Sequence, residues 1–502
     1  MTILLTDEYR DQISGEISCY DRIVIKGTLR PFCYAEGMTM FLNVNKTRIF
    51  DYPKFVEPLR NELRDNAELI AKENSIEIEF VTNKVRKENL ISKIIDKRGD
   101  HPGLVHIISA METCNSYKPW HDKKTHKTYL KYTQGKCLHY YFYFIDELLG
   151  LCYVRVPTWC PFQLQIYFNG HNLLASKLKE HDIDYVLKDN AFLTISDFTT
   201  AQNLSDQLNI DDILEKLNEF ADKYCPVIKK FNLNYHFSIM QAEYATDIIF
   251  KSQKKLQVLY ENLVRTAIHT VKPENIATFL GKKIHFNYQD EMGNNYNIRI
   301  NGARIKHAMG PVNIKMYDKF GIILRIETTV NDVSFFKHYR TVEHRDGTKS
   351  KKNAPMKKSL FSLASLQELL KASNNRYLQF ISTFDDKVDG IEKLNKVSRK
   401  VVDNNRPYKG FNFFDDADQS ILEAVAAGEF NISGFQNKDM RKKLKDKTSG
   451  QISRILKRLH THGLIKKIAR TYKYYISKFG RQVIMLGLKL KELFIIPQLA
   501  AK

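Results

Sequence analysis

The chain has 502 residues, with 78 Lys and Arg against 57 Asp and Glu, which gives a net charge of +21 at pH 7. Hydrophobic residues make up 43% and aromatic residues 12%, so an intrinsically disordered or fibrous chain is excluded. The positive charge favours a polyanionic partner, nucleic acid first and an acidic membrane surface second. At roughly 100–200 residues per domain, the length predicts two to four domains.

Cysteine spacing and the first residues indicate the compartment. The seven cysteines are irregularly spaced and form no Cys-x-x-Cys motif, which argues against a zinc ribbon or a disulfide framework. The first residues reach Asp7 and Glu8 before any basic segment, and no window has the ~18 apolar residues of a membrane helix. We expect a cytoplasmic protein that does not bind membranes.

Residues 1–200 predict one mixed α/β domain. Residues 21–29 alternate as a strand before Pro31, and residues 56–74 place apolar side chains along one helical face. A second helix is predicted over 172–180. Further strands are predicted over 76–81, 104–110, 138–145, 151–156, 164–168, 185–187 and 192–195.

Residues 201–290 predict a helical region, with helices over 211–224, 237–251, 254–271 and 273–280. On the helix over 237–251, helical spacing would align four polar side chains in a network, namely Gln241, Glu243, Tyr244 and Asp247.

Residues 291–345 predict an antiparallel β-meander, because short alternating stretches are separated by turn signals such as Asn301-Gly302. Its strands are predicted over 296–300, 303–307, 312–318 and 322–328. In the last hairpin one face is apolar, and the other carries Arg325, Glu327, Asn313, Lys315 and Tyr317. This polar face is a candidate active-site surface.

Residues 346–405 predict a connector. Six basic residues and one acid in 345–358 suggest a solvated basic linker, and residues 360–386 are typical of a helix.

Residues 406–502 predict a winged helix-turn-helix domain. Helices are expected over 416–426, 437–444 and 449–460, then strands over 464–468 and 472–476, then a helix over 478–490. The stretch SGQISRILKRLHTHGLIKKIARTYKYYISKFG resembles the DNA-binding core of MarR-like regulators. The resemblance implies binding of double-stranded DNA. In total the fold class expected is α+β and multidomain.

The third of these helices has a face suited to the major groove. Residues 436–481 hold 15 Lys and Arg against two acids. Gln451 and Arg454 are candidates for base contacts, because Gln can bond adenine and Arg guanine with two hydrogen bonds. The full predicted DNA-binding set is Ser449, Gln451, Ser453, Arg454, Lys457, Arg458, Lys466, Lys467, Arg470 and Lys473. The alternative is a domain used only for protein docking.

The segment IKMYDK followed by LRIE resembles part of the rolling-circle replication initiators of filamentous phages and small plasmids. These enzymes nick DNA with a tyrosine and a divalent metal. The resemblance implies Glu327 as a metal ligand, with Mg²⁺ or Mn²⁺ as cofactor, and Tyr339 or the competing Tyr317 as nucleophile. Arg325 would neutralise the transition state. The alternative is that Arg325 and Glu327 form a surface ion pair. The His-hydrophobic-His metal pair of many such enzymes is absent.

Asp21 opens the first strand and is a second candidate metal ligand, which would pair with Glu112 or Asp146 for two-metal chemistry. Walker-type phosphate loops, Gly-x-Gly-x-x-Gly, His-Glu-x-x-His and Gly-x-Ser-x-Gly are absent from the sequence, so no nucleotide or organic cofactor is expected.

A second nucleic-acid surface is predicted over residues 115–136, where six Lys and one Asp are interleaved with aromatic residues. Single strands stack their bases on such rings and place phosphates on lysines. The candidates are Lys123, Lys124, Lys127, Tyr129 and Lys131. A solvated loop is the alternative.

Most of the chain resembles a large bacterial family without an assigned activity, through RGDHPGLVHIISAME, IKMYDKFGIILRIETTVNDVSFFKHYR and KGFNFF. We expect a DNA-binding protein of a mobile element, acting as a nicking nuclease, transposase or replication-initiation factor. One alternative is a non-enzymatic transcription regulator with a large N-terminal sensing or assembly region. Another is an RNA-binding protein. A homodimer is compatible with each of them.

Overall fold

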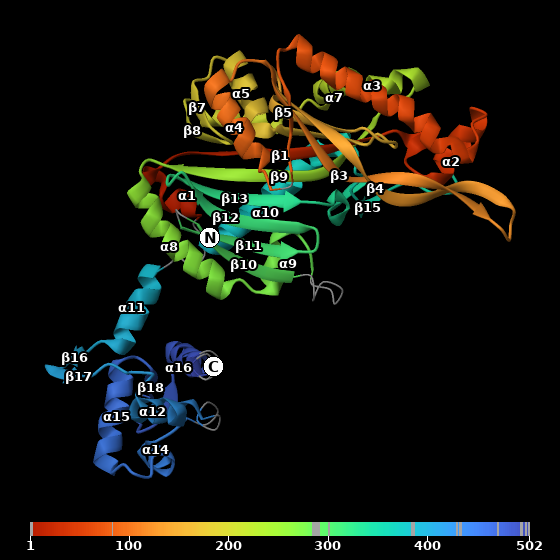
Figure 1. The fold of residues 1–502 in the computed structure, drawn as a ribbon. Helices are drawn as coiled ribbons and strands as arrows, with labels where there is room; N and C mark the ends of the chain where they lie inside the picture. The colour runs from red at the N-terminus through yellow and green to blue at the C-terminus, as the bar shows by residue number, and fades with distance from the viewer. Residues whose placement is uncertain are drawn as a thin grey trace. The chain divides into compact units, whose positions relative to one another are not determined.

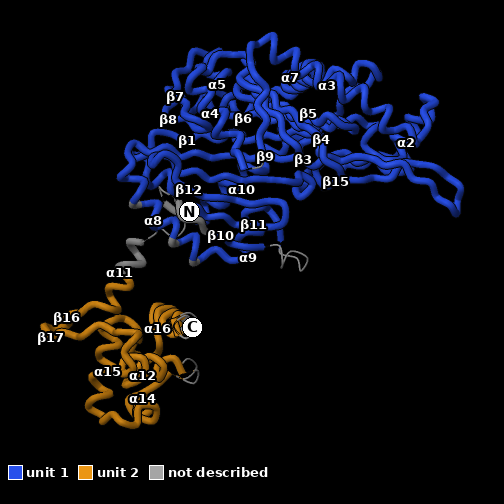
Figure 2. The backbone as a smooth tube through the Cα atoms, viewed as in Figure 1, with its two compact units in different colours: residues 1–383 blue, residues 384–502 orange. Residues whose placement is uncertain are grey.

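The computed structural model describes residues 4–82, 84–283, 292–299, 302–382, 387–427, 430, 434–468, 471–491, 495, 496 and 499. The chain forms two compact units, residues 1–383 and 384–502 (Figure 2). Both helices and strands occur in each unit, so the expected α+β class is confirmed.

Unit 1 is built on one large mixed sheet (Figure 1). Its strand order is β10-β11-β12-β13-β9-β1-β6-β5-β4-β3-β2. Neighbouring strands are antiparallel except β2 and β3, which are parallel. The strands are β1 Ile13–Thr28, β2 Ile78–Phe80, β3 Gly103–Asp122, β4 Lys127–Asp146, β5 Gly150–Pro157, β6 Leu164–Asn169, β9 His236–Phe250, β10 Met292–Arg299, β11 Gly302–Met309, β12 Val312–Lys319 and β13 Ile323–Val330.

The first face of the sheet carries the largest apolar core of unit 1. Ile23, Ile248 and Ile326 belong to it, on three neighbouring strands. Amphipathic helices contribute the apolar side chains that cover this face, as in α3, where buried residues recur at helical spacing. The helices are α3 Tyr52–Glu73, α7 Ile210–Tyr224, α8 Gln253–Thr270, α9 Pro273–Phe279 and α10 Leu363–Ser382. The short helices α1 Leu5–Glu8 and α2 Ala35–Val44 complete it.

The second face carries two smaller cores with polar side chains between them. One core packs Ile17, Ile249 and Ile323 against helices α5 Gly170–Glu180 and α6 Phe198–Asp206 and the hairpin of β7 Tyr185–Lys188 and β8 Ala191–Ile195. The other packs strands β3, β4 and β5 against helix α4 Lys87–Arg98. The polar face predicted for the β-meander belongs to this side of the sheet.

The helix predicted over 237–251 is wrong, because these residues form strand β9. Gln241, Glu243 and Asp247 lie on the second face, while Tyr244 and Ile248 lie on the first. Neighbouring strands cover both sides of β9, and its last residues, 245–250, are buried on both faces. In this stretch the polar residues Thr246 and Asp247 lie on opposite faces, so the alternation of polar and apolar residues is interrupted and helical spacing fits the segment as well.

The predicted segments 1–200, 201–290 and 291–345 are not separate structural units, because their strands alternate in one sheet. The solvated linker predicted over 345–358 is also wrong in part. Strands β14 Lys337–Glu343 and β15 Lys349–Pro355 form a two-stranded hairpin there. The exposed lysines of β15 give this strand the polarity of a loop.

Unit 2 contains the elements predicted for the C-terminal region in the predicted order. They are α12 Asp416–Ala426, α14 Asn437–Lys443, α15 Ser449–Thr461, β18 Ile465–Lys467, β19 Tyr474–Ile476 and α16 Lys478–Leu490. Three elements that were not predicted precede them, namely α11 Lys387–Ser398, β16 Val401–Asp403 and β17 Arg406–Tyr408. Ile452, Leu456 and Leu459 of α15 are buried in its core, as the helical spacing predicts.

All seven cysteines are free thiols. Among the described residues, no helix combines the length and the apolar character needed to span a bilayer.

Candidate active site

Three carboxylates from neighbouring strands converge on the second face of the sheet. Asp21 lies on β1, Glu243 on β9 and Glu327 on β13, and one ligand oxygen from each lies within 4.8 Å of the others. We call these residues the acidic triad. The pairing of β1 with β9 shifts between Tyr20 and Arg22, and this bulge brings Asp21 onto the same side as Glu243.

Lys315 and Tyr317 on β12 hold Glu327. The strand register places Lys315 opposite Glu327 and Tyr317 opposite Arg325, which confirms the predicted polar face. Lys315 Nζ lies 2.5 Å from Glu327 Oε1 and 3.4 Å from Glu243 Oε1, and the Tyr317 hydroxyl donates to Glu327 Oε2 at 2.7 Å. The ammonium therefore bridges two members of the acidic triad.

Burial and the neighbouring charges shift the pKa values of Glu243, Lys315 and Tyr317. Burial, together with the nearby Glu327 carboxylate, raises the pKa of Glu243 above its ordinary value. Burial alone would lower the pKa of Lys315, but the two carboxylates hold it above the ordinary value. Burial and Glu327 raise the pKa of Tyr317 well above 10.

Arg325 is completely buried and binds two carboxylates, Asp247 and the triad member Asp21. It donates through Nε and Nη2 to the two oxygens of Asp247, each at 2.6 Å, and Nη1 lies 3.4 Å from Asp21 Oδ2. Two expectations are thereby corrected. Arg325 and Glu327 are not a surface ion pair, and Arg325 has no exposed surface with which to meet a substrate phosphate. The two buried aspartates account for its position.

Helix α5 brings His171 to the same aspartates. Its Nδ1 lies 3.3 Å from Asp21 Oδ1, and its Nε2 lies 3.7 Å from Asp247 Oδ2. The side chain of Asn169 caps the helix by accepting the His171 N–H at 2.7 Å. Gly170 allows the approach, because a Cβ there would lie 2.3 Å from the Tyr20 carbonyl oxygen. Burial would lower the pKa of His171, but Cys19, Asp21 and Asp247 raise it.

A cavity of about 260 Å³ lies beside the triad, lined in part by Arg22, Asn190 and Tyr167. Asn190 connects the cavity to the acidic triad, because it lines the cavity and its Nδ2 donates to Asp21 Oδ1. Its side-chain oxygen accepts from Lys319. Burial, together with the positive charge of Arg325, lowers the pKa of Lys319 to about 8. The cavity wall therefore carries Arg22 together with the acids Glu88 and Asp189, and Lys319 is linked to it through Asn190.

Besides His171 Nδ1, whose contact with Asp21 is an ion pair, two buried polar atoms near the triad have no hydrogen-bond partner among the described residues. Asn313 Oδ1 is an unpaired acceptor on β12, on the same face as Lys315, and Arg22 Nε is an unpaired donor at the cavity. A buried polar atom without a partner is costly, and such atoms are common where a ligand is expected. The acceptor suits a cation and the donor suits an anion.

The other predicted site residues lie elsewhere. Tyr339 is 72% exposed on the separate hairpin β14–β15, so the structure brings Tyr317 and not Tyr339 to Glu327. Glu112 does not join Asp21, because Lys87, Tyr141 and Arg155 bind it. Asp146 instead caps a turn by accepting the N–H groups of residues 148 and 149.

Sequence reasoning missed Glu243, Asp247, His171 and Asn190 as members of the site. Glu243 and Asp247 fall within the helix predicted over 237–251. Their period-two spacing with Gln241 is the signal that would have placed them on one strand face. His171 follows the end of strand β6, and Asn190 lies in the turn between β7 and β8. Nothing in the local sequence distinguishes either residue.

In unit 2 the predicted DNA-binding residues fall into two groups. Arg454, Lys466 and Lys467 are exposed, Lys473 is partly exposed, and Arg470 lies outside the described residues. Arg458 instead forms a two-pronged pair with Asp418, with distances of 2.6 and 2.8 Å, so its predicted phosphate contact is wrong. A guanidinium held by a buried carboxylate is not available to DNA.

The remaining polar residues of α15 also have intramolecular partners. Gln451 Oε1 accepts the Thr448 N–H at 2.7 Å in a capping box, so this oxygen is occupied. Ser449 and Ser453 both bond to Asn437 on α14. Lys457 pairs with Asp403 at 2.6 Å.

Comparisons with protein-family models, curated proteins and solved structures gave no match to this chain.

Proposed function

We propose that this chain is a DNA-binding, divalent-metal-dependent nuclease of a mobile element, and that the acidic triad is its catalytic centre. The observation that carries the proposal is the convergence of Asp21, Glu243 and Glu327 from three neighbouring strands. Hydrolysis of phosphodiester bonds by carboxylate-held Mg²⁺ or Mn²⁺ needs such a cluster beside an anion-binding surface.

The donor set fits a hard divalent cation. Three carboxylates and the unpaired Asn313 Oδ1 are oxygen donors, the type that Mg²⁺ and Mn²⁺ prefer. The ammonium of Lys315 lies between Glu243 and Glu327, so a divalent ion bound there would compete with it for these carboxylates. A bound divalent ion would polarise the scissile phosphate and lower the pKa of an attacking water.

The groups around the triad fit a phosphodiester substrate. The unpaired Arg22 Nε points to a site for a phosphate oxygen at the cavity. We assign to Lys319, whose pKa is lowered to about 8, the donation of a proton to the leaving oxygen near neutral pH. Because the pKa of Tyr317 is raised well above 10, we assign attack to water and a positioning role to Tyr317.

Unit 2 supports DNA as the polymer. We propose that it is a winged helix whose α15 enters the major groove, with Arg454 as the base-contacting residue. Residues 436–481 hold 15 Lys and Arg against two acids; Lys466 and Lys467 lie on β18, and Lys473 immediately precedes β19. This charge suits phosphates beside the groove.

The test is nicking of supercoiled plasmid and cleavage of single-stranded DNA by the full chain with Mg²⁺ or Mn²⁺. Wild type should cleave, whereas Glu327→Gln and Asp21→Asn should lose at least about a hundredfold in rate. Glu79→Gln is the matched control, since this acid is on strand β2 of the same sheet but outside the triad. Absence of cleavage with either metal would refute the proposal. A covalent protein–DNA adduct lost in Tyr317→Phe would assign the attack to tyrosine.

A non-enzymatic regulator is the second candidate. The observation in its favour is the neutralised network, in which Arg325 and Lys315 already pair with all four carboxylates of the region. This candidate expects specific duplex binding that is weakened by Arg454→Ala, without cleavage. RNA that copurifies in preference to DNA would favour the RNA-binding alternative.

A further inference from the structure

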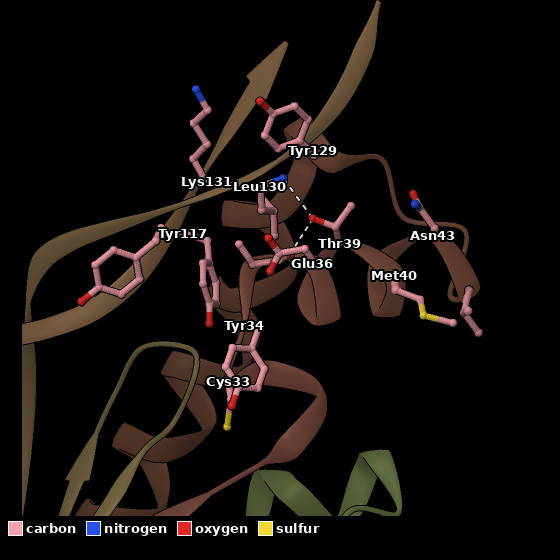
Figure 3. Close-up of a pocket in the computed structure, with 13 residues that line it drawn as sticks. Cys33, Tyr34, Glu36, Thr39, Met40, Asn43, Tyr117, Tyr129, Leu130 and Lys131 are labelled. Carbon is pink, nitrogen blue, oxygen red and sulfur yellow. Dashed lines mark hydrogen bonds between the residues drawn. The ribbon is translucent and has the colours of Figure 1, made fainter. Parts of the chain in front are cut away.

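A second candidate binding surface lies on residues 115–136, at the hairpin end of strands β3 and β4. Residues 115–136 form a long hairpin that projects from the sheet (Figure 1), and we call it the arm. Between the arm and helix α2 is an open groove of about 680 Å³ (Figure 3). Tyr34, Glu36, Met40 and Tyr132 are among its lining residues.

Hydrogen bonds connect the two walls of the groove and fix the ring of Tyr132. Thr39 Oγ1 on α2 accepts the Leu130 N–H of β4 at 3.0 Å and donates to the Ala35 carbonyl at 2.7 Å. The Tyr132 hydroxyl donates to Asn115 Oδ1 at 2.6 Å, which sets the direction of the ring. A ligand therefore meets a preformed surface, with little ordering cost.

Large apolar side chains at the groove are exposed to solvent. Tyr34 is 70% exposed, Met40 69% and Tyr132 56%. The rings of Tyr34 and Tyr132 provide planar faces on which bases stack without sequence preference.

The arm itself carries a high density of positive charge. Lys118, Lys123, Lys124, Lys127 and Lys136 are exposed, and Asp122 is the one acid of residues 115–136. On the other side of β4 from Thr39, Tyr129 and Lys131 project outward (Figure 3), and Lys131 Nζ lies 3.8 Å from the Trp120 ring centre. This side of the arm thus combines a cation with aromatic rings.

We infer that the arm and its groove bind single-stranded nucleic acid, with bases stacked on Tyr34 and Tyr132 and phosphates on the arm lysines. Single strands suit the groove better than a duplex, because only unpaired bases expose their faces to rings. The inference deepens the proposed function by naming the strand held by unit 1. It rests on that proposal only for the use of the strand, not for its binding.

The test is fluorescence anisotropy with labelled oligo-dT, using the full chain in EDTA so that no cleavage occurs. Arg454→Ala is present throughout to weaken binding by unit 2. Tyr34→Ala/Tyr132→Ala should weaken oligo-dT binding at least about tenfold and change duplex binding less than about twofold. Phe50→Ala is the matched control, because this residue is 62% exposed and is not part of the groove lining.

The salt dependence of binding and a comparison with lipid vesicles test the role of the lysines. Lys123→Gln/Lys124→Gln/Lys127→Gln should weaken binding and reduce the slope of log affinity against log salt by about 0.7 for each phosphate that is no longer bound. Equal affinity of the double tyrosine variant and the Phe50 control would overturn the inference. So would binding to phosphatidylserine vesicles, but not to oligo-dT, that the lysine variant abolishes. Since EDTA excludes cleavage, failure of the nuclease proposal would leave these results interpretable.

Discussion

Arg325 and Asp247 form a buried two-pronged ion pair, with both N–O distances at 2.6 Å and neither side chain more than 1% exposed. The pair joins β13 to β9, where Arg325 and Asp247 are register partners, and Arg325 lies two residues before Glu327 on β13. Arg325 also reaches Asp21, so one guanidinium compensates two buried carboxylates.

Removal of this guanidinium should destabilise unit 1 strongly. Arg325→Met should lower the free energy of unfolding by about 3–5 kcal/mol, because Asp247 and Asp21 would be left buried without their main counter-charge. Urea denaturation followed by circular dichroism measures the change. Arg48→Met, at an exposed position, should stay within about 0.5 kcal/mol of wild type. A loss for Arg325→Met no larger than that control would show that the pair is not needed for stability.

The ionisation of Lys319 should appear in the pH dependence of cleavage. Its pKa is lowered to about 8, so the protonated form that donates to the leaving oxygen is lost as the pH rises through 8. The single-turnover rate should fall above pH 8 in wild type. Lys319→Arg should remove this decline, since arginine remains protonated there. An identical decline in both proteins would show that another group titrates.

Glu112 should contribute stability in a defined pH range. Burial would raise its pKa, but Lys87, Tyr141 and Arg155 lower it from 4.5 to about 2. The stabilisation is therefore complete above the unfolded-state pKa near 4.5 and is lost as the pH falls towards 2. Glu112→Gln should cost about 2 kcal/mol at pH 7, after allowance for solvent screening. The difference between the two proteins should shrink by about pH 3 in urea denaturation, and a difference that grows instead would contradict this sign.

Two arginines on α15 should behave in opposite ways. Arg458 binds Asp418 and the carbonyls of Lys409 and Gly410, so Arg458→Ala should lower the stability of unit 2 by about 2–3 kcal/mol. Arg454 is exposed, so Arg454→Ala should leave stability unchanged and weaken duplex DNA binding about tenfold or more. Thermal denaturation and electrophoretic mobility shift separate the effects. Equal effects of the two variants on both measurements would remove the distinction.

The sequence predicted best the parts of the fold with a clear period. The meander strands around Lys315 and Glu327 and the core face of α15 were correct, because alternation and helical spacing are local properties. Strand β9 was missed, since it is central in the sheet and buried on both faces towards its end.

Two members of the acidic triad, Asp21 and Glu327, are candidate metal ligands from sequence, but their proximity was not predicted. They are about three hundred residues apart, and the contact depends on β9 lying between β1 and β13. Long-range strand order is not encoded in any local pattern. The predicted role of Arg325 failed for a related reason, because its partner Asp247 falls within the wrongly predicted helix.

The most direct test of the central claim is calorimetric titration of the full chain with Mn²⁺, for wild type, Glu243→Gln/Glu327→Gln, Lys315→Met and the control Glu79→Gln. Wild type and control should bind Mn²⁺ with equal affinity, and the double variant should lose this binding. Lys315→Met should bind at least about fivefold more tightly, because the ammonium between Glu243 and Glu327 no longer repels the ion. Because the pKa of Glu243 is raised, wild-type affinity should begin to fall at a pH above the ordinary 4.5. Binding that is unchanged in the double variant, or no binding by wild type, would contradict a metal site at the acidic triad.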